Sequence, residues 1–187
     1  MRVFEEIVAS FQPISIPTKM SKPYDHLHAY WRMEYIETPK ALKGKNPFVE
    51  LPKVENERES LVLFRGDTGY LILNRYPYNA GHLLALPYRE AVDLESLDSE
   101  ERAEFLDLII KAKQILTHAI QPDAFNIGIN LGHSAGAGIP SHLHAHIVPR
   151  WDGDTNFMPV IGHTRVLPSA LESMWDRLKQ AVTELEL

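Results

Sequence analysis

The stretch FNIGINLGHSAGAGIPSHLHAHIVPR, which runs from Phe125 to Arg150, carries three histidines at alternate positions, His142, His144 and His146. Apolar residues separate them. Successive side chains of a β-strand point to opposite faces, so the alternation predicts a strand over 142–148 with all three imidazoles on one face. Neighbouring histidines would lie roughly 6.5 Å apart and the outer pair about 13 Å apart. The stretch therefore predicts a row of imidazoles along a strand.

Three interpretations of this row remain open. In the first, two of the histidines bind zinc with ligands from elsewhere, because imidazole nitrogens must converge at about 2.0–2.1 Å from one ion. In the second, His144 attacks an electrophile while its neighbours position substrate groups and tune its protonation. In the third, the strand lies at the surface and its histidines have no chemical role.

A loop of small residues, Gly132–Gly138, comes shortly before the row. Glycine lets the backbone approach a ligand closely with its N–H groups directed at oxygen atoms, an arrangement that suits phosphate groups. Glycine-rich loops are most often turns, so the loop alone is a weak indication. Beside a row of histidines, it favours covalent catalysis on an anionic substrate.

The sequence HLHAHIV at 142–148 resembles the signature of the histidine triad family, in which three histidines alternate with apolar residues and two apolar residues follow. Asn74–Pro87, with its Gly-His pair, is similar to the family's first strand pair, and Asn126–Asn130 to its strand before the triad. Trp151–Pro159 and Tyr30–Ile36 resemble more narrowly the diadenosine tetraphosphate phosphorylase and ATP adenylyltransferase branch. The likeness covers most of the chain beyond its N-terminal arm.

The fold class that the resemblance implies is α+β, with a central, mainly antiparallel sheet of about five strands on which a long helix and a C-terminal helix pack. Residues 1–29 are expected to form an N-terminal arm and residues 30–187 one histidine-triad domain. Apolar runs bounded by turn residues predict strands at 60–65, 69–75, 82–87, 125–131 and 142–148.

Two capping patterns predict where the helices begin. Asp98 followed by Glu101 is a capping box, in which the two side chains satisfy backbone N–H groups of the first turn, and the helix is expected to continue to about Ala119. Ser169 and Glu172 predict a similar capping box for the C-terminal helix.

The resemblance implies nucleotidyl transfer, in which His144 in its neutral form attacks the α-phosphorus of a nucleoside polyphosphate. His142 and His146 would balance the phosphate charge and disfavour protonation of the central ring. Loop amides and nearby side chains would bind the equatorial oxygens. The residues expected to contact the substrate are Asn74, His82, Asn130, Ser134, Gly136, Ala137, Gly138, Ser141, Trp151, Asn156 and Phe157.

Several of these residues also have purely structural interpretations. Asn74 is expected either to bond a ribose hydroxyl or only to serve the turn after its strand. His82 is expected to contact the substrate or to make a structural hydrogen bond. Trp151 and Phe157 suit stacking on a nucleobase, although Trp151 in the core is equally consistent.

The function that follows is a phosphorylase that converts diadenosine tetraphosphate and phosphate to ADP and ATP through a nucleotidyl-histidine intermediate on His144. With water as acceptor the same site would be a hydrolase. Two further hypotheses are a metal-dependent hydrolase that uses two of the histidines and a noncatalytic nucleotide-binding module.

No cofactor is expected for this chemistry, although a divalent cation would be compatible with a polyphosphate substrate. Many relatives carry two zinc-binding cysteines in the loop that corresponds to Lys40–Glu50. This chain has Lys45, Asn46 and Val49 in that neighbourhood and no cysteine at all. A structural zinc is therefore predicted to be absent, and the loop is expected to be held by packing.

The composition argues against nucleic acid and membranes as binding partners. A formal net charge of −6 argues against broad nucleic-acid binding, which requires many Lys and Arg side chains opposite phosphates. No apolar run approaches the roughly 20 residues of a membrane helix, and Glu5 and Glu6 interrupt the N-terminus, so a cytoplasmic protein without membrane contact is expected. The resemblance implies a homodimer.

Overall fold

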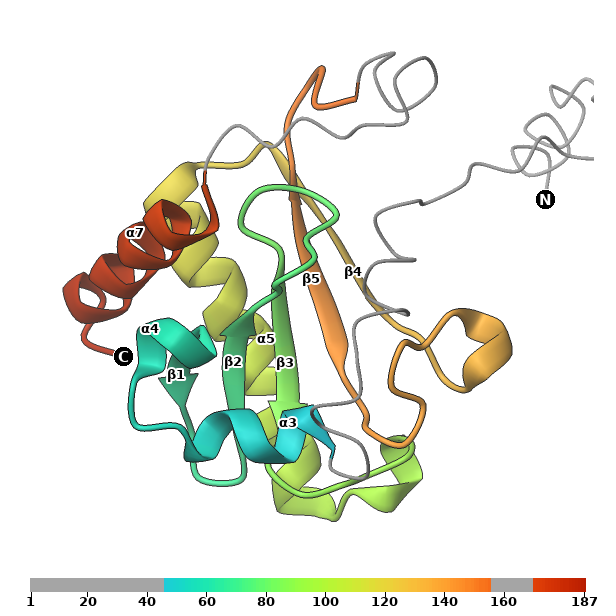
Figure 1. Ribbon diagram of the computed structural model, residues 1–187. Coiled ribbons are helices and arrows are strands. Elements are labelled where there is room, and N and C mark those ends of the chain that lie inside the picture. Colours follow the sequence, from blue (N-terminus) through green and yellow to red (C-terminus); the bar gives the residue numbers. More distant parts are fainter. Residues whose placement is uncertain (1–45, 156–169) are drawn as a thin grey trace, which may run out of the picture.

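The computed structural model (Figure 1) describes residues 46–155 and 170–187 of the chain. The predicted N-terminal arm, 1–29, the aromatic segment Tyr30–Ile36, and Asn156 and Phe157 of the predicted substrate site lie outside these residues. Among the helices of the described ranges, none combines the length and the apolar character that crossing a membrane requires.

Five strands form one antiparallel sheet in the order β1-β2-β3-β5-β4. Their bounds are β1 Val62–Arg65, β2 Gly69–Leu73, β3 Leu83–Pro87, β4 Ala124–Ile129 and β5 Ala145–Arg150. Two main helices accompany the sheet, α5 Ser99–Ile120 and α7 Leu171–Glu184. The predicted α+β class and the five-stranded antiparallel sheet are confirmed.

Short helical turns connect these elements. They are the α-helices α3 Pro47–Glu50 and α4 Glu57–Ser60, and the 3₁₀ turns η1 Leu51–Lys53, η2 Leu94–Ser96 and η3 His133–Ala135. Figure 1 shows α3 at one end of β3, close to the chain that leads into β5. This position brings α3 next to the histidines.

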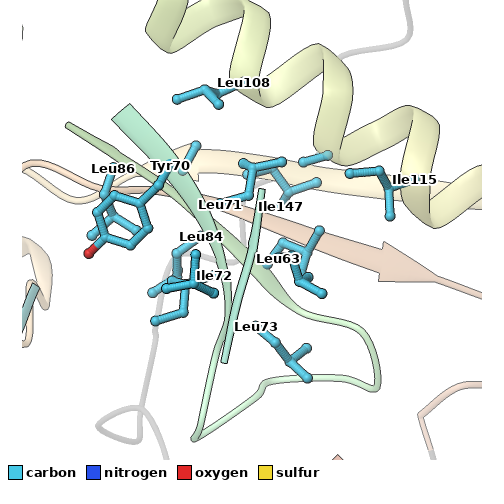
Figure 2. Close-up of a cluster of buried hydrophobic side chains, with 14 of the residues drawn as sticks. Leu63, Tyr70, Leu71, Ile72, Leu73, Leu84, Leu86, Leu108, Ile115 and Ile147 are labelled. Atoms are coloured by element: carbon cyan, nitrogen blue, oxygen red, sulfur yellow. The ribbon is translucent and has the colours of Figure 1, made fainter. Parts of the chain in front are cut away.

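The main core lies between the sheet and α5. Every residue of β2 and β3 is buried, because the two strands are central in the sheet. Leu108 and Ile115 reach from α5 to the face of the sheet that contains Leu71 and Ile147 (Figure 2). Helix α7 packs beside α5 and against β1, and Trp175 donates a hydrogen bond to the Val62 carbonyl at 3.2 Å.

The two helix starts differ from one another. Asp98 and Glu101 form the predicted capping box of α5, which ends at Ile120, one residue beyond the expected end. The predicted box of the C-terminal helix is wrong, because Ala170 occupies the N-cap of α7 and makes no side-chain cap hydrogen bond. That helix instead depends on its buried face, which includes Trp175 and Leu178.

The predicted strand over 142–148 begins later than its alternation indicates, at Ala145. The backbone N–H of His142 donates to the Ile139 carbonyl at 3.1 Å, and that of Leu143 to the Ala91 carbonyl at 2.6 Å. These bonds draw the chain away from β3 before the sheet pairing starts. The first two histidines therefore precede the strand, and His146 alone of the three lies within it.

Gly81, immediately before the buried His82, lies where both backbone and space require glycine. Its φ is +78°, and a Cβ there would approach the Ile120 Cδ1 to 2.7 Å. Gly132 has a similar φ of +80° with open space around it. We expect Gly81→Ala to lower the free energy of unfolding by about 2–3 kcal/mol and Gly132→Ala by only about 1 kcal/mol. Urea denaturation measures both, and equal losses would show that packing against α5 is unimportant.

Candidate active site

His146 faces away from α5. In the sheet register it lies opposite Leu84 of β3, whereas its neighbour Ile147 belongs to the face that α5 covers. The His144 ring lies edge-on to the His146 ring, with centroids 5.0 Å apart. Phe48 of α3 lies beside the group, with its ring centroid 5.5 Å from the rings of both His142 and His144. The three histidines thus gather under α3 at one end of β5.

His144 is almost completely buried, with 5% of its surface exposed. Its Nδ1 lies 2.8 Å from the backbone carbonyl of His142. A carbonyl only accepts hydrogen bonds, so Nδ1 carries the hydrogen and donates it. In the neutral ring Nε2 is then the nitrogen with the lone pair, and the protein fixes the tautomer that a nucleophilic imidazole needs.

His142 has a different environment. Its Nε2 lies 2.9 Å from the Pro87 carbonyl, so this nitrogen is the donor, and its Nδ1 lies 3.0 Å from the side-chain amide nitrogen of Asn46. Burial lowers the pKa of His142, with a smaller lowering contribution from His144, although the bond to Pro87 opposes the shift. Both ring nitrogens are occupied by protein groups, which suits a supporting role.

A second pair of rings continues the site on the side of His146. The Tyr78 backbone N–H donates to Nδ1 of His82 at 3.0 Å, so in the neutral ring the hydrogen of His82 is on Nε2. That nitrogen lies 3.0 Å from Nδ1 of His146, to which it donates. The hydrogen of a neutral His146 is therefore on Nε2. The Asn130 side-chain nitrogen lies 3.5 Å from Nε2, and the Asn130 amide accepts this hydrogen when it is turned so that its oxygen faces the ring. A backbone N–H thus determines, through two imidazoles, which nitrogen of His146 is a donor.

Asn74 contacts His82, the first histidine of this pair. Its side-chain nitrogen is 3.3 Å from Nδ1 of His82, and its side-chain oxygen accepts from the Tyr76 N–H at 3.0 Å. In the described residues Asn74 therefore contacts His82 and its own turn. A contact with a ribose hydroxyl stays a prediction.

The predicted phosphate loop has a compact turn at its centre. The Gly136 N–H donates to the His133 carbonyl at 3.0 Å, as part of η3. Ser134, Gly138 and Ser141 are exposed, whereas Ala137 is buried. Because the loop ends only four residues before His142, it lies close to the triad along the chain. Its contacts with phosphate stay predictions.

Trp151 lies at the far end of β5, five residues beyond His146 and roughly 17 Å away along the strand. Its backbone N–H donates to the Asp154 carboxylate at 3.1 Å. Within the described chain the structure does not bring Trp151 together with the triad. Stacking of its indole on a nucleobase stays a prediction.

Sequence reasoning missed three residues at the site. The Tyr78 ring stacks on the His146 ring, with centroids 5.5 Å apart and planes inclined by 22°. Phe48 packs on the other two histidines, and Asn46 bonds to His142. The local signal for Asn46 is its place as an N-cap directly before Pro47. That signal locates a helix start, but not a partner 96 residues away.

Of the loop Lys40–Glu50, only residues 46–50 are described. At Asn46 hydrogen bonds to His142 and Glu90 add to the expected packing. In the described part of the chain, no group of three or more His, Cys, Asp or Glu side chains is arranged to hold a metal ion. The absence of a structural zinc stays a prediction.

Asp154 fastens the end of β5 to the loop before His82. It accepts from Nε and Nη2 of Arg150 at 2.6 and 2.7 Å and from the Asn79 amide at 2.9 Å. The hydrogen bonds of Arg150 are the largest reason why the pKa of Asp154 falls to about 2. Asn79 is adjacent to Tyr78, so this ion pair supports the loop that fixes the tautomer of His82.

This lowered pKa gives a testable stability difference. The Asp154 carboxylate stabilises the fold above its ordinary pKa of 3.8 and loses this effect as the pH falls toward 2. We expect Asp154→Asn to lower the free energy of unfolding by about 2 kcal/mol at neutral pH. The difference from the wild type should shrink below pH 4 in urea titrations. The exposed neighbour Asp152, changed to Asn, is the control, and a constant difference across this window would contradict the assignment.

Comparison with known proteins supports the family that the three histidines indicate. The HIT domain family matches residues 55–153, and the chain belongs to this family of histidine triad proteins. The chain is 41% identical over 157 residues to a protein of Mycobacterium tuberculosis named AP-4-A phosphorylase, covering 79% of this chain and 80% of that protein. A bis(5'-nucleosyl)-tetraphosphatase of Schizosaccharomyces pombe is 33% identical over 95 residues, 51% of this chain and 52% of that protein.

The fold agrees with a solved structure. A histidine triad nucleotide-binding protein of Sulfolobus tokodaii superimposes with a TM-score of 0.61 at 23% identity, covering 75% of this chain and 94% of that one. At this identity the likeness concerns the fold. Together with the curated relatives, it makes the chain a HIT-family protein similar to enzymes that process dinucleoside polyphosphates.

Proposed function

We propose that this protein is a dinucleoside polyphosphate phosphorylase that converts diadenosine tetraphosphate and phosphate to ADP and ATP through a nucleotidyl-histidine on His144. The observation that carries the proposal is the bond from Nδ1–H of His144 to the His142 carbonyl. This bond makes Nε2 the nucleophilic nitrogen in the neutral ring. The 41% identity to a protein named AP-4-A phosphorylase supports the choice of substrate and acceptor.

In the first half-reaction, Nε2 of His144 attacks the α-phosphorus, a nitrogen–phosphorus bond forms, and the phosphorus–oxygen bond to the departing ATP breaks. The ring becomes a cationic imidazolium, whose Nδ1–H donates a stronger hydrogen bond to the His142 carbonyl. In the second half-reaction, an oxygen of inorganic phosphate attacks the same phosphorus, the nitrogen–phosphorus bond breaks, and ADP is released.

The donors around the reacting phosphorus come from two sides. Nε2–H of His146, oriented through His82, would donate to an oxygen of the phosphate that is transferred or released. Asn130 and Ser134, together with N–H groups of the loop 136–138, would bind the remaining oxygens. Close to His144, which is 5% exposed, little water competes for these oxygens, whereas Ser134 and Gly138 belong to an exposed part of the loop.

A hydrolase that uses water as the second acceptor is the other candidate. The 33% identity to a tetraphosphatase favours it. The products distinguish the two functions, because attack by water gives AMP and ATP, whereas attack by phosphate gives ADP and ATP. We expect ADP and ATP in equal amounts in phosphate buffer, and ADP labelled from ³²P-phosphate. Formation of AMP at the same rate with and without phosphate would establish the hydrolase.

We also propose that the protein acts as a homodimer in the cytoplasm, where nucleoside polyphosphates are made, and that it binds small nucleotides rather than nucleic acid. In the described chain β4 is one of the two outer strands of the sheet and pairs only with β5. Ile127 and Leu131, in β4 and just after it, are 47% and 45% exposed. An edge strand with exposed apolar side chains suits pairing with a second copy. Sedimentation velocity measures the state directly.

A further inference from the structure

The side chain of Asn46 makes three hydrogen bonds to three parts of the chain. Its oxygen accepts from the Phe48 N–H at 3.0 Å, as the N-cap of α3. Its nitrogen lies 2.7 Å from a carboxylate oxygen of Glu90 and 3.0 Å from Nδ1 of His142. The carboxylate can only accept, so one amide hydrogen is directed to Glu90, and the other is directed to His142. The orientation of the amide is therefore determined at both ends.

This orientation decides the protonation of His142. Because the Asn46 amide donates to Nδ1, that nitrogen must present a lone pair. The Pro87 carbonyl requires a hydrogen on Nε2 at the other side of the ring. His142 is consequently held as a neutral ring of one tautomer between two fixed partners. Its backbone carbonyl is the acceptor for Nδ1–H of His144.

We propose that Asn46 is a positioning residue for the nucleophile, which it controls by holding His142 neutral and in one orientation. Glu90 contributes by fixing the amide so that nitrogen, and not oxygen, faces the ring. The inference deepens the proposed function and rests on it, because it assigns control of the His144 alignment to a residue outside the triad. None of the three bonds of Asn46 involves His144 itself.

Several groups among the described residues face the His142 ring besides Asn46. His144 is the neighbouring titratable group and opposes protonation, whereas the Glu90 carboxylate favours it. The Pro87 carbonyl accepts from Nε2, and the Phe48 ring makes an edge contact with the His142 ring. A donor at Nδ1 is therefore what prevents Glu90 from drawing a proton onto the ring.

Asn46→Asp reverses that donor with almost no change in shape. Aspartate remains a good N-cap, so the bond to the Phe48 N–H is kept. The second carboxylate oxygen would now face Nδ1 of His142 and Glu90. A proton on Nδ1 would donate to this oxygen, and the positive charge of the ring would offset the charge of the two carboxylates. Asn56→Asp is the matched control, because Asn56 is the N-cap of the equally short α4 and its side-chain oxygen accepts from the Arg58 and Glu59 N–H groups.

The test is ¹⁵N NMR of the histidine rings, with His142 assigned by its loss in His142→Gln. In the wild type and in Asn56→Asp we expect the shifts of a neutral Nε2–H ring at neutral pH. In Asn46→Asp we expect imidazolium shifts, with a pKa above the ordinary value of 6.5. A His142 ring that stays neutral in Asn46→Asp would overturn the proposal.

Rates of nucleotidyl-enzyme formation give the second readout. We expect Asn46→Asp to lower kcat about tenfold with KM unchanged, because a charged and shifted His142 misaligns the carbonyl that orients the nucleophile. If Asn46→Asp showed imidazolium shifts for His142 but an unchanged kcat, the proposed control of the His144 alignment by His142 would be refuted. If diadenosine tetraphosphate were not the substrate, the ring shifts would still differ between the variants, so the failure of each proposal is recognisable separately.

Discussion

His144→Ala is expected to abolish turnover of diadenosine tetraphosphate, with a loss in kcat of at least about 10⁴-fold. The reason is that the substitution removes the only atom that forms a bond to phosphorus in the first half-reaction. Affinity for the substrate should change little, because the proposed donors Asn130 and Ser134 remain. Single-turnover kinetics measure the loss, and equilibrium binding to the variant measures the affinity.

The matched control is His118→Gln. His118 lies on α5 and pairs at the surface with Glu184 of α7 at 2.6 Å, so its replacement should leave kcat unchanged. If the wild type showed no turnover and His144→Ala changed only the affinity, the protein would be a binding module without covalent chemistry. If it kept turnover, another residue would be the nucleophile.

His82→Leu is expected to lower kcat roughly 10²-fold, although His82 is fully buried and is proposed to act through another ring. The leucine removes the donor to Nδ1 of His146, so this ring no longer has a fixed tautomer. Its Nε2 then carries the hydrogen in only part of the molecules. The loss should appear in kcat at every pH, since the ratio of the two neutral tautomers of His146 does not depend on pH.

His82→Gln distinguishes this role from a purely structural one. A glutamine side chain supplies an acceptor for the Tyr78 N–H and a donor for His146, as the imidazole does. We expect it to recover most of the lost kcat at similar thermal stability. Equal loss in both variants would mean that the site needs the ring for packing and not for its hydrogen bonds.

Local patterns in the sequence predicted much of the fold. The capping box of α5 depends on Asp98 and Glu101, two residues within one turn, and the structure has both bonds. The strands β2 and β3 follow from buried apolar runs between turns. Alternation failed at His142 because the backbone of 142 and 143 bonds to Ile139 and to Ala91. A contact with residue 91 leaves no periodic signal at residue 143.

For the site, as for the fold, local patterns predicted which residues take part but not their distant partners. The motif identified the three histidines but not their different roles, which follow from which backbone carbonyl or N–H each ring meets. His82 meets the N–H of Tyr78, and His142 meets the amide of Asn46. Partners outside the motif therefore set the tautomers, and the local pattern of a single sequence does not reveal such pairs.

The most direct measurement is the intact mass of the protein after mixing with diadenosine tetraphosphate in phosphate-free buffer. The proposed function predicts that the protein gains the mass of one adenylyl group, that fragmentation places the group on His144, and that added phosphate releases it as ADP. Turnover to ADP and ATP with no trace of an adduct under rapid quenching, or an adduct on another residue, would contradict it.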